Sequence, residues 1–270
     1  MSSLVTYSLL DKYRACPRKC YLRYHEGLVP LERPTHMEDG TAVHSLLEWR
    51  YGTGETFDWS AWPDKGEMLQ ALMTGYTNKV YVQDLVDYEV LAVEKEFRHT
   101  LSGVEYGGKI DLLLVSKIDG RLYVCDHKYS GSVPDPLLVR GDLQTFLYAT
   151  VAQAIYGIEL GGVMLNYIKR PYQGKKGVLW GKHFSDPTSY NRIVWRYTEQ
   201  EMEELFYELE MWTNKYFDSA KTNTWLRNTR ECGKFVGYPC EYANVCYRND
   251  KTDYEVQRPH GELSEERGKV

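Results

Sequence analysis

A pair of apolar strands joined by a tight turn constrains the fold of this 270-residue chain more than any other feature. Residues 109–115 and 121–129 are both rich in apolar side chains, and Asp119-Gly120 lies between them. An Asp-Gly step between two such runs is typical of a β-hairpin, because both residues accept the left-handed backbone that the turn requires. The two segments are therefore expected to be neighbouring antiparallel strands.

Strands and helices alternate around this hairpin. Residues 91–101 predict a strand before it, and residues 162–168 and 178–184 predict strands after it. Apolar residues recur at helical spacing in several further segments. The helices expected from that spacing cover residues 7–24 (in two pieces, divided at Pro17), 41–51, 66–87, 137–156 and 198–220. This order predicts an α/β fold with a central mixed β-sheet flanked by helices.

The composition fits a single packed domain. Apolar residues make up 43% of the chain and charged residues 26%, which suffices for a large core. No apolar run approaches the ~20 residues that a membrane helix needs, and no basic segment followed by an apolar stretch opens the chain. We therefore expect a cytoplasmic protein without a membrane partner. The expected organisation is one domain over 1–252, with N-terminal helices in 6–51, a core in 88–220, a cysteine segment in 221–250 and a disordered tail in 253–270.

The net charge of −5 hides an uneven distribution. The charged residues of segment 199–210 are all acidic, whereas those of segments 12–23 and 168–182 are all basic. Two basic segments are able to contact phosphates whatever the global sign, although solvated surface faces explain them equally well. Three aromatic residues near the second segment are candidates for stacking on unpaired bases: Tyr167, Tyr172 and Trp180.

Two carboxylates and a lysine interrupt the apolar hairpin. Side chains alternate along a strand, so Asp126 and Lys128 share one face of residues 121–129. Asp111 interrupts the other strand and can lie beside Asp126. Converging carboxylates repel each other unless a cation sits between them, and hard divalent cations prefer oxygen ligands. The pattern indicates metal-assisted phosphodiester hydrolysis, with a surface ion pair as the simpler reading of Asp126 and Lys128 alone.

Four short motifs in order resemble one family. They are Gly40-Thr41-Ala42-Val43-His44, Gly108-Lys109-Ile110-Asp111, Asp126-His127-Lys128 and Gln144-Thr145-Phe146-Leu147-Tyr148. Together they resemble the PD-(D/E)XK nuclease superfamily in its RecB-like branch, over roughly residues 8–250. The resemblance implies a restriction-endonuclease-like core.

The resemblance also implies roles for individual residues. Asp111 and Asp126 would be metal ligands for Mg²⁺ or Mn²⁺, Lys128 the catalytic lysine, and the backbone carbonyl of His127 a further ligand. His44 would bind the metal or orient water, with a satisfied core histidine as the alternative. Gln144 and Tyr148 share a helix face and would approach the site or the DNA backbone, or simply pack. Of Glu94 and Glu96, Glu94 better fits the family's additional acidic position.

Three cysteines, Cys232, Cys240 and Cys246, lie within fifteen residues near the end of the chain. Spacing alone leaves zinc and a four-iron four-sulfur cluster open, with Cys16 or Cys20 as the fourth ligand. Relatives of the AddB and CRISPR-associated kinds hold such a cluster through one N-terminal cysteine in a Cys-Pro-Arg-Lys context. The resemblance thus implies a 4Fe-4S cluster on Cys16, Cys232, Cys240 and Cys246 that joins the N- and C-terminal segments, with zinc as the alternative. Cys125 is expected to be a core residue.

The expected function is a metal-dependent DNA exonuclease that prefers single-stranded ends. Recombination or repair is the expected setting, in a bacterial or phage-infected cytoplasm, with a recombination or helicase protein as a separate partner. Two alternatives stay open: a structure-selective endonuclease on the same scaffold, and a non-catalytic iron–sulfur DNA-binding module. The intact Asp111, Asp126 and Lys128 argue against the second alternative.

Overall fold

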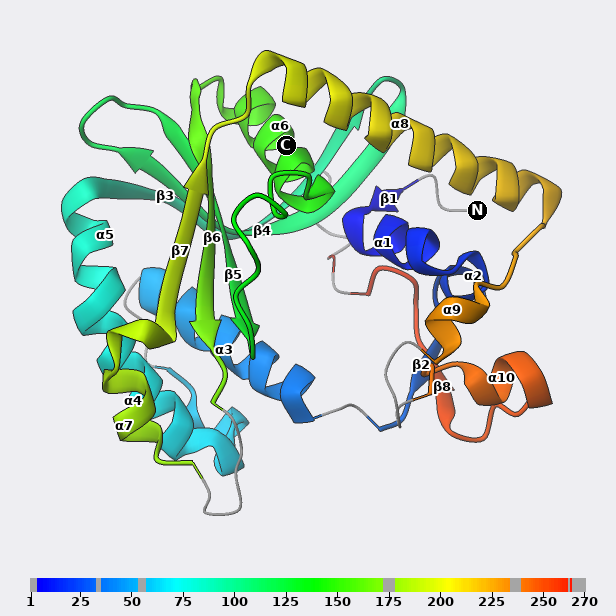
Figure 1. Cartoon of the computed structure of the whole chain (residues 1–270), viewed down its shortest axis with the longest axis horizontal. Coiled ribbons are helices and arrows are strands. Elements are labelled where there is room, and N and C mark those ends of the chain that lie inside the picture. The colour runs from blue at the N-terminus through cyan, green and yellow to red at the C-terminus, as the bar shows by residue number, and fades with distance from the viewer. Residues whose placement is uncertain are drawn as a thin grey trace. The chain divides into compact units, whose positions relative to one another are not determined.

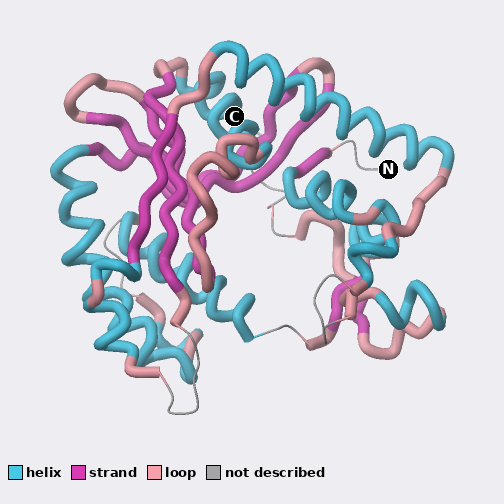
Figure 2. The backbone as a smooth tube through the Cα atoms, in the orientation of Figure 1, coloured by secondary structure: helices cyan, strands magenta, loops and turns pink. Residues whose placement is uncertain are grey.

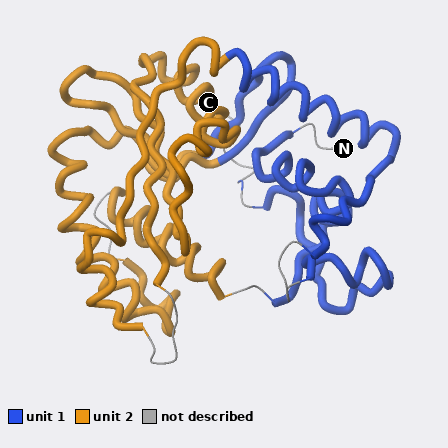
Figure 3. Tube along the Cα trace, in the orientation of Figure 1, with its two compact units in different colours: residues 1–33, 96–108, 203–270 blue, residues 34–95, 109–202 orange. Residues whose placement is uncertain are grey.

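A computed structural model describes residues 4–32, 35–52, 57–171, 178–233, 239–261 and 263. The chain forms two compact units (Figure 3). Unit 1 comprises residues 1–33, 96–108 and 203–270, and unit 2 comprises residues 34–95 and 109–202. No helix of the described residues is both long enough and apolar enough to cross a membrane.

The sheet of unit 2 is mixed, as expected. Its strands are β3 (Tyr88–Leu101), β4 (Val104–Ser116), β5 (Leu122–Ser130), β6 (Leu160–Lys169) and β7 (Tyr190–Trp195), the first two of which continue into unit 1. β4 pairs with β3 and is antiparallel to β5, β5 is parallel to β6, and β6 is antiparallel to β7. Figure 2 shows the strands of the sheet in magenta. The predicted hairpin is confirmed: Gly120, at φ +69°, donates its N–H to the carbonyl of Ser116 at 2.8 Å.

Helices cover both faces of this sheet (Figure 1). On one face, α3 (Thr35–Tyr51), α4 (Gly66–Tyr76) and α7 (Trp180–Ser185) form a core with Leu112 of β4 and Cys125 of β5. Cys125 is thus a core residue, as expected. On the other face, α6 (Leu143–Tyr156) packs against β5 and β6. The shorter helices of unit 2 are η1 (Trp59–Ala61), η2 (Pro63–Lys65), η3 (Thr77–Tyr81), α5 (Val82–Asp87) and η4 (Pro187–Ser189).

Two predicted elements of unit 2 are wrong. The helix expected from residue 137 begins at Leu143, because Asp142 caps it by accepting the N–H groups of Gln144 and Thr145. The strand expected at 178–184 is instead α7, and its place in the sheet is taken by β7. Trp180 and Phe184 stack on each other with ring centroids 6.1 Å apart, which is the i, i+4 contact of a helix.

Unit 1 combines short helices with two pairs of strand segments. Its elements are β1 (Val5–Thr6), α1 (Tyr7–Ala15), α2 (Pro17–Tyr24), β2 (Leu28–Pro30), most of α8 (Glu199–Thr222), α9 (Thr229–Cys232), α10 (Ala243–Arg248) and β8 (Tyr254–Val256). Pro17 opens α2, as the sequence predicts. β1 runs parallel to Tyr106 and Gly107 of β4, and β2 is antiparallel to β8.

The expectation of a disordered tail from residue 253 is wrong for β8. Tyr254–Val256 pair with β2, and Tyr254 stacks on Tyr242 with ring centroids 5.7 Å apart. Tyr242 in turn donates its hydroxyl proton to the carbonyl of Leu28 in β2 at 2.9 Å. A short polar segment thus becomes ordered because its backbone and one aromatic ring both find partners. Residues 262 and 264–270 of the expected tail lie outside the described residues.

Candidate active site

The hairpin of β4 and β5 brings two carboxylates onto neighbouring strands. Asp111 precedes Leu112 and Asp126 follows Cys125, and Leu112 and Cys125 are partners in the β4–β5 ladder. The backbone N–H of His127 donates to Oδ2 of Asp111 at 2.8 Å. Both carboxylates are buried. The expected proximity of Asp111 and Asp126 therefore follows from the register of one tight turn.

A group of three potential metal ligands surrounds Asp111. One ligand atom each of His44, Glu94 and Asp111 lies within 4.8 Å of the others, and no second group of this kind occurs in the described part of the chain. His44 comes from α3, with its Nδ1 3.5 Å from Oδ2 of Asp111. Its ring meets that of His127 edge-on, with ring centroids 6.3 Å apart. Carboxylate oxygens with an imidazole nitrogen fit a divalent cation.

Glu94 enters this group through an unusual backbone conformation. Its φ is +46°, in the left-handed region that non-glycine residues rarely adopt. The conformation lies in the middle of β3, and the Glu94 carboxylate forms an ion pair with Lys109. Strain of this kind persists where the surrounding structure enforces it, often at functional sites. Of the two acids left open by the sequence, Glu94 belongs to the ligand group and Glu96 does not.

Asp126 begins a row of polar contacts that leads away from the three ligands. Its Oδ2 lies 2.7 Å from Nζ of Lys128. Lys128 donates to Oε1 of Gln144 at 2.8 Å, and Nε2 of Gln144 donates to the hydroxyl of Tyr148 at 3.3 Å. Gln144 and Tyr148 lie one turn apart on α6, so the helix presents both to β5. Lys128 therefore connects Gln144 and Tyr148 with Asp126.

Burial and charge shape the protonation of this site. Burial, followed by the nearby Asp126 charge, raises the pKa of Asp111 well above its usual range, although the N–H of His127 opposes the shift. Burial lowers the pKa of His44, with Asp126 and Glu94 acting in the opposite direction. Burial alone would lower the pKa of Lys128, but the Asp126 carboxylate raises it overall. Buried carboxylates that resist ionisation are what a divalent cation stabilises in the charged form.

The side chain of His127 points to the opposite face of the sheet from Lys128. Its ring stacks on that of Tyr51 with centroids 5.9 Å apart, and its Nδ1 lies 3.0 Å from Nδ2 of Asn166. The backbone N–H of His127 is the group that donates to the ligand Asp111. Sequence reasoning missed two neighbours of the site: Asn166, a polar residue within an apolar strand, and Glu48, one turn after His44 on α3. Burial, then Glu94, raises the pKa of Glu48.

The cysteines predicted to bind a cofactor all lie in unit 1. Sγ of Cys16 accepts the N–H of Asn228 at 3.4 Å, and Sγ of Cys232 donates to the carbonyl of Asn228 at 3.7 Å. Cys240 donates its N–H to the carbonyl of Cys232 at 3.0 Å. The cysteines are thus neighbours, but the described residues do not gather three of their sulfur atoms into one ligand group. The structure does not support a preformed 4Fe-4S site.

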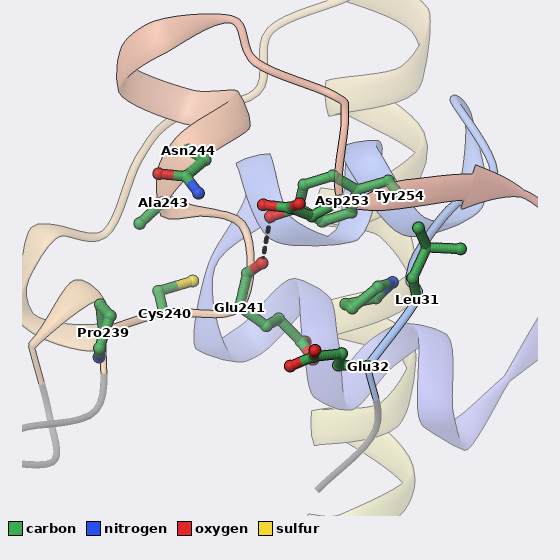
Figure 4. A pocket seen from close by; sticks show the side chains of 10 residues that line it. Leu31, Glu32, Pro239, Cys240, Glu241, Ala243, Asn244, Asp253 and Tyr254 are labelled. Carbon is green, nitrogen blue, oxygen red and sulfur yellow. Dashed lines mark hydrogen bonds between the residues drawn. The ribbon is translucent and has the colours of Figure 1, made fainter.

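Cys240 also lines the wall of a cavity of about 430 Å³ (Figure 4). Three acids share that wall: Glu32, Glu241 and Asp253. Glu241 accepts a hydrogen bond from the Tyr254 hydroxyl through its backbone carbonyl. The surplus of acids makes this cavity unsuited to a phosphate group.

The basic segments differ in how freely they can meet a phosphate. In residues 12–23, Lys12 and Lys19 both pair with Glu241, at 3.3 and 3.0 Å, and Arg14 pairs with Glu208 at 3.2 Å. Glu241 and Glu208 therefore offset part of the positive charge of this segment within unit 1. The other segment retains exposed Lys169 and Lys182, while residues 172–177, with Tyr172, lie outside the described residues.

The prediction that Tyr167 stacks on bases is wrong, because its side chain is buried within β6. Trp180 remains partly exposed and stacks on Phe184.

A mixed sheet flanked by helices, with buried carboxylates and a lysine at its central strands and a histidine of α3 beside them, defines an α/β protein of the restriction-endonuclease-like kind with a candidate metal site. The chain belongs to the PD-(D/E)XK nuclease superfamily, which matches residues 5–247. Members of this superfamily use divalent metals. No curated protein matches the sequence.

Solved structures share the fold at low sequence identity. A crystal structure of a candidate exonuclease from Eubacterium rectale aligns with a TM-score of 0.52 and 14% identity, covering 97% of this chain and 91% of that one. The crystal structure of the protein SSO0001 aligns with a TM-score of 0.31 and 14% identity, covering 78% and 77% of the two chains. The first similarity supports the fold.

Proposed function

We propose that this chain is a divalent-metal-dependent deoxyribonuclease of the RecB-like branch that degrades single-stranded DNA from its ends. The observation that carries the proposal is the ligand group of His44, Glu94 and Asp111 beside the Asp126–Lys128 pair. Nuclease superfamily membership supports the reaction class. The proposed setting is recombination or repair in a bacterial or phage-infected cytoplasm, with any helicase a separate chain.

Each site residue has a distinct proposed role. His44, Glu94 and Asp111, with Asp126 and the carbonyl of His127 adjoining them, would hold Mg²⁺ or Mn²⁺. The bound ion supplies Lewis acidity and lowers the pKa of water. Lys128 is cationic beside Asp126 and would stabilise charge that develops on the phosphate oxygens. Gln144 and Tyr148 fix the direction of the Lys128 ammonium group.

The second basic segment provides the proposed path for the DNA backbone. Lys169 is the partner of Ser130 in the β5–β6 ladder, so it lies at the end of β5 that carries Lys128. The N–H of Arg170 donates to the carbonyl of Ser130 at 2.7 Å, which fixes the start of the segment at the same place. Contacts to phosphates carry no sequence information. We therefore expect cleavage without sequence preference that weakens steeply with salt.

A metal centre on the cysteines forms a second part of the proposal. Cys16, Cys232, Cys240 and Cys246 would hold a 4Fe-4S cluster, with zinc as the alternative. The shared contacts of Cys16 and Cys232 with Asn228 support this ligand set. Cys20 is less suitable because it is fully buried and its Sγ donates to the carbonyl of Leu9 at 3.6 Å.

The proposed activity is tested with end-labelled linear and circular single-stranded DNA in the presence of Mg²⁺ or Mn²⁺. The wild-type protein is expected to degrade linear strands and to leave circles largely intact. Asp126→Ala and Lys128→Ala are expected to abolish cleavage while DNA binding remains. Asp64→Asn, an exposed acid in η2, serves as the control and is expected to cleave normally.

The outcomes separate the proposal from its alternatives. Circles cut as fast as linear strands would indicate an endonuclease. DNA binding without cleavage in either metal would indicate a non-catalytic module. Wild-type turnover by either active-site variant at saturating metal would disprove the assignment of Asp126 and Lys128.

A further inference from the structure

A continuous row of buried polar groups lies behind the candidate active site. Nδ1 of His127 lies 3.0 Å from Nδ2 of Asn166, which lies 2.6 Å from the hydroxyl of Tyr76. The hydroxyls of Tyr76 and Tyr51 are 3.0 Å apart, and Tyr51 donates to Oδ2 of Asp84 at 2.5 Å. His127, Asn166, Tyr76 and Asp84 are all at most 4% exposed. The mechanism proposed above uses none of these side chains.

The hydrogen bonds of this row all donate in one direction, which Asp84 determines at the outer end. Arg192 donates two N–H groups to the Asp84 carboxylate, at 2.5 and 2.9 Å, so this carboxylate acts as an acceptor. The single hydroxyl proton of Tyr51 is committed to Asp84, and Tyr51 must therefore accept from Tyr76. Tyr76 donates its only hydroxyl proton to Tyr51, so its hydroxyl oxygen accepts a hydrogen bond from Nδ2 of Asn166.

Asn166 transfers this direction to His127. Its amide nitrogen has two protons: one goes to Tyr76 and the other points to Nδ1 of His127. Nδ1 must accept, so the ring proton of His127 resides on Nε2. Asn166 and His127 are also direct partners in the β5–β6 ladder. The side-chain contact therefore ties together the two strands that meet behind the candidate site.

The backbone of His127 contacts the ligand group. The backbone N–H of His127 donates to Oδ2 of Asp111, and the same oxygen lies 3.5 Å from Nδ1 of His44. A rotation of β5 at His127 would disturb both ligands together. We propose that Asn166 is a positioning residue, which Asp84 orients through Tyr51 and Tyr76 and which fixes His127 so that its backbone N–H holds Asp111 in place beside His44. The inference rests on the proposed metal site but not on the choice of DNA substrate.

Asn166→Asp tests the donor direction at nearly constant shape. A carboxylate is unable to donate to Nδ1, so the proton of His127 is expected to move from Nε2 to Nδ1. Nitrogen NMR of protein labelled with ¹⁵N-histidine distinguishes the two tautomers, and the signal that moves in the variant identifies His127 among the seven histidines. For cleavage, we expect kcat to fall about 10–100-fold, as is typical when a group behind a metal ligand is lost, with KM for DNA unchanged.

Two tyrosine variants complete the experiment. Tyr51→Phe removes one hydroxyl from the row and is also expected to lower kcat. It replaces Asn166→Asp as the test if that variant does not fold. Tyr129→Phe is the matched control, because Tyr129 packs against the same core but its hydroxyl contacts Sδ of Met68 outside the row. The control is expected to retain the wild-type kcat and the wild-type tautomer.

The results also separate this proposal from the proposed function. A wild-type His127 protonated on Nδ1 would overturn the inferred direction, and an unchanged kcat in Asn166→Asp would overturn the positioning role. If the wild-type protein does not cleave DNA, Mn²⁺ affinity measured by calorimetry replaces kcat. Asn166→Asp is then expected to bind Mn²⁺ about 10–100-fold more weakly, and equal affinity would overturn the proposal.

Discussion

At the scale of single residues, the candidate site depends on groups that lie in energetically unfavourable positions. Asp111 is buried beside a second carboxylate, and Glu94 adopts a left-handed backbone within a strand. Neither feature improves the stability of the apo protein. Both become favourable when a cation joins the carboxylates, because binding to the native state alone stabilises it. The residues that weaken this fold are therefore the ones expected to bind.

The backbone of Glu94 provides a prediction about stability. Glu94→Gly and Glu94→Ala both remove the carboxylate and its ion pair with Lys109, but only alanine retains a Cβ at φ +46°. We expect the glycine variant to be more stable to urea than the alanine variant by about 1 kcal/mol. Both should lose Mn²⁺ affinity equally.

The neighbouring position supplies the control. Lys95 is exposed and has no left-handed φ, so Lys95→Ala is expected to be more stable than Lys95→Gly. The same order of stability at positions 94 and 95 would contradict strain at Glu94.

At the scale of elements, α4 and α7 pack closely because a glycine separates them. A Cβ placed on Gly75 would lie 2.0 Å from the carbonyl oxygen of Phe184 and 2.4 Å from the hydroxyl of Tyr190. Since the first of these is backbone, the helices would have to move apart. The contact fixes how the segment after β6 returns to the sheet as β7.

Gly75→Ala is accordingly expected to lower the free energy of unfolding by about 1–3 kcal/mol, the usual cost of overpacking. Gly66→Ala is the matched control within the same helix, because a Cβ there meets nothing within 4 Å. Urea denaturation of both variants measures the difference. Equal stability of the two variants would show that α4 and α7 separate without cost.

The sequence predicts elements well where the information is local. The Asp119-Gly120 turn predicts the β4–β5 hairpin, and the hairpin alone brings Asp111 beside Asp126. Local information failed at Trp180, because the apolar residues of 178–184 also place Trp180 and Phe184 one helical turn apart.

The contact of Asn166 with His127 was not predictable either. It depends on the register of β5 and β6, which a helix and its loops separate in the chain. The family resemblance did favour Glu94 over Glu96, but nothing local in β3 indicates the left-handed backbone that Glu94 adopts in the ligand group.

At the scale of the whole molecule, unit 1 is assembled from three separate stretches of chain. Contacts at Asn228 connect Cys16 with Cys232, and Tyr242 connects with Leu28. Closing such long loops costs entropy, which a metal centre on the cysteines would offset most effectively.

We therefore expect anaerobically purified protein to contain iron and to absorb broadly near 400 nm. Cys16→Ser should lose the iron and lower the melting temperature, whereas Cys20→Ser, in a buried position on the adjacent helix, should retain the iron. Zinc without iron in the purified protein would indicate a structural zinc site and not an iron–sulfur cluster. The reverse behaviour of the two variants would make Cys20 the fourth ligand.

The pairing of β2 with β8 has a consequence for synthesis on the ribosome. β2 emerges early, but Tyr242, the partner of Leu28, follows 214 residues later, and β8 later still. At about 5–20 residues per second, β2 waits roughly 10 s or longer with its backbone groups unpaired. The residues of unit 2 leave the ribosome within that interval. The order of translation thus favours completion of the sheet that carries the candidate active site before the cysteine-bearing unit closes.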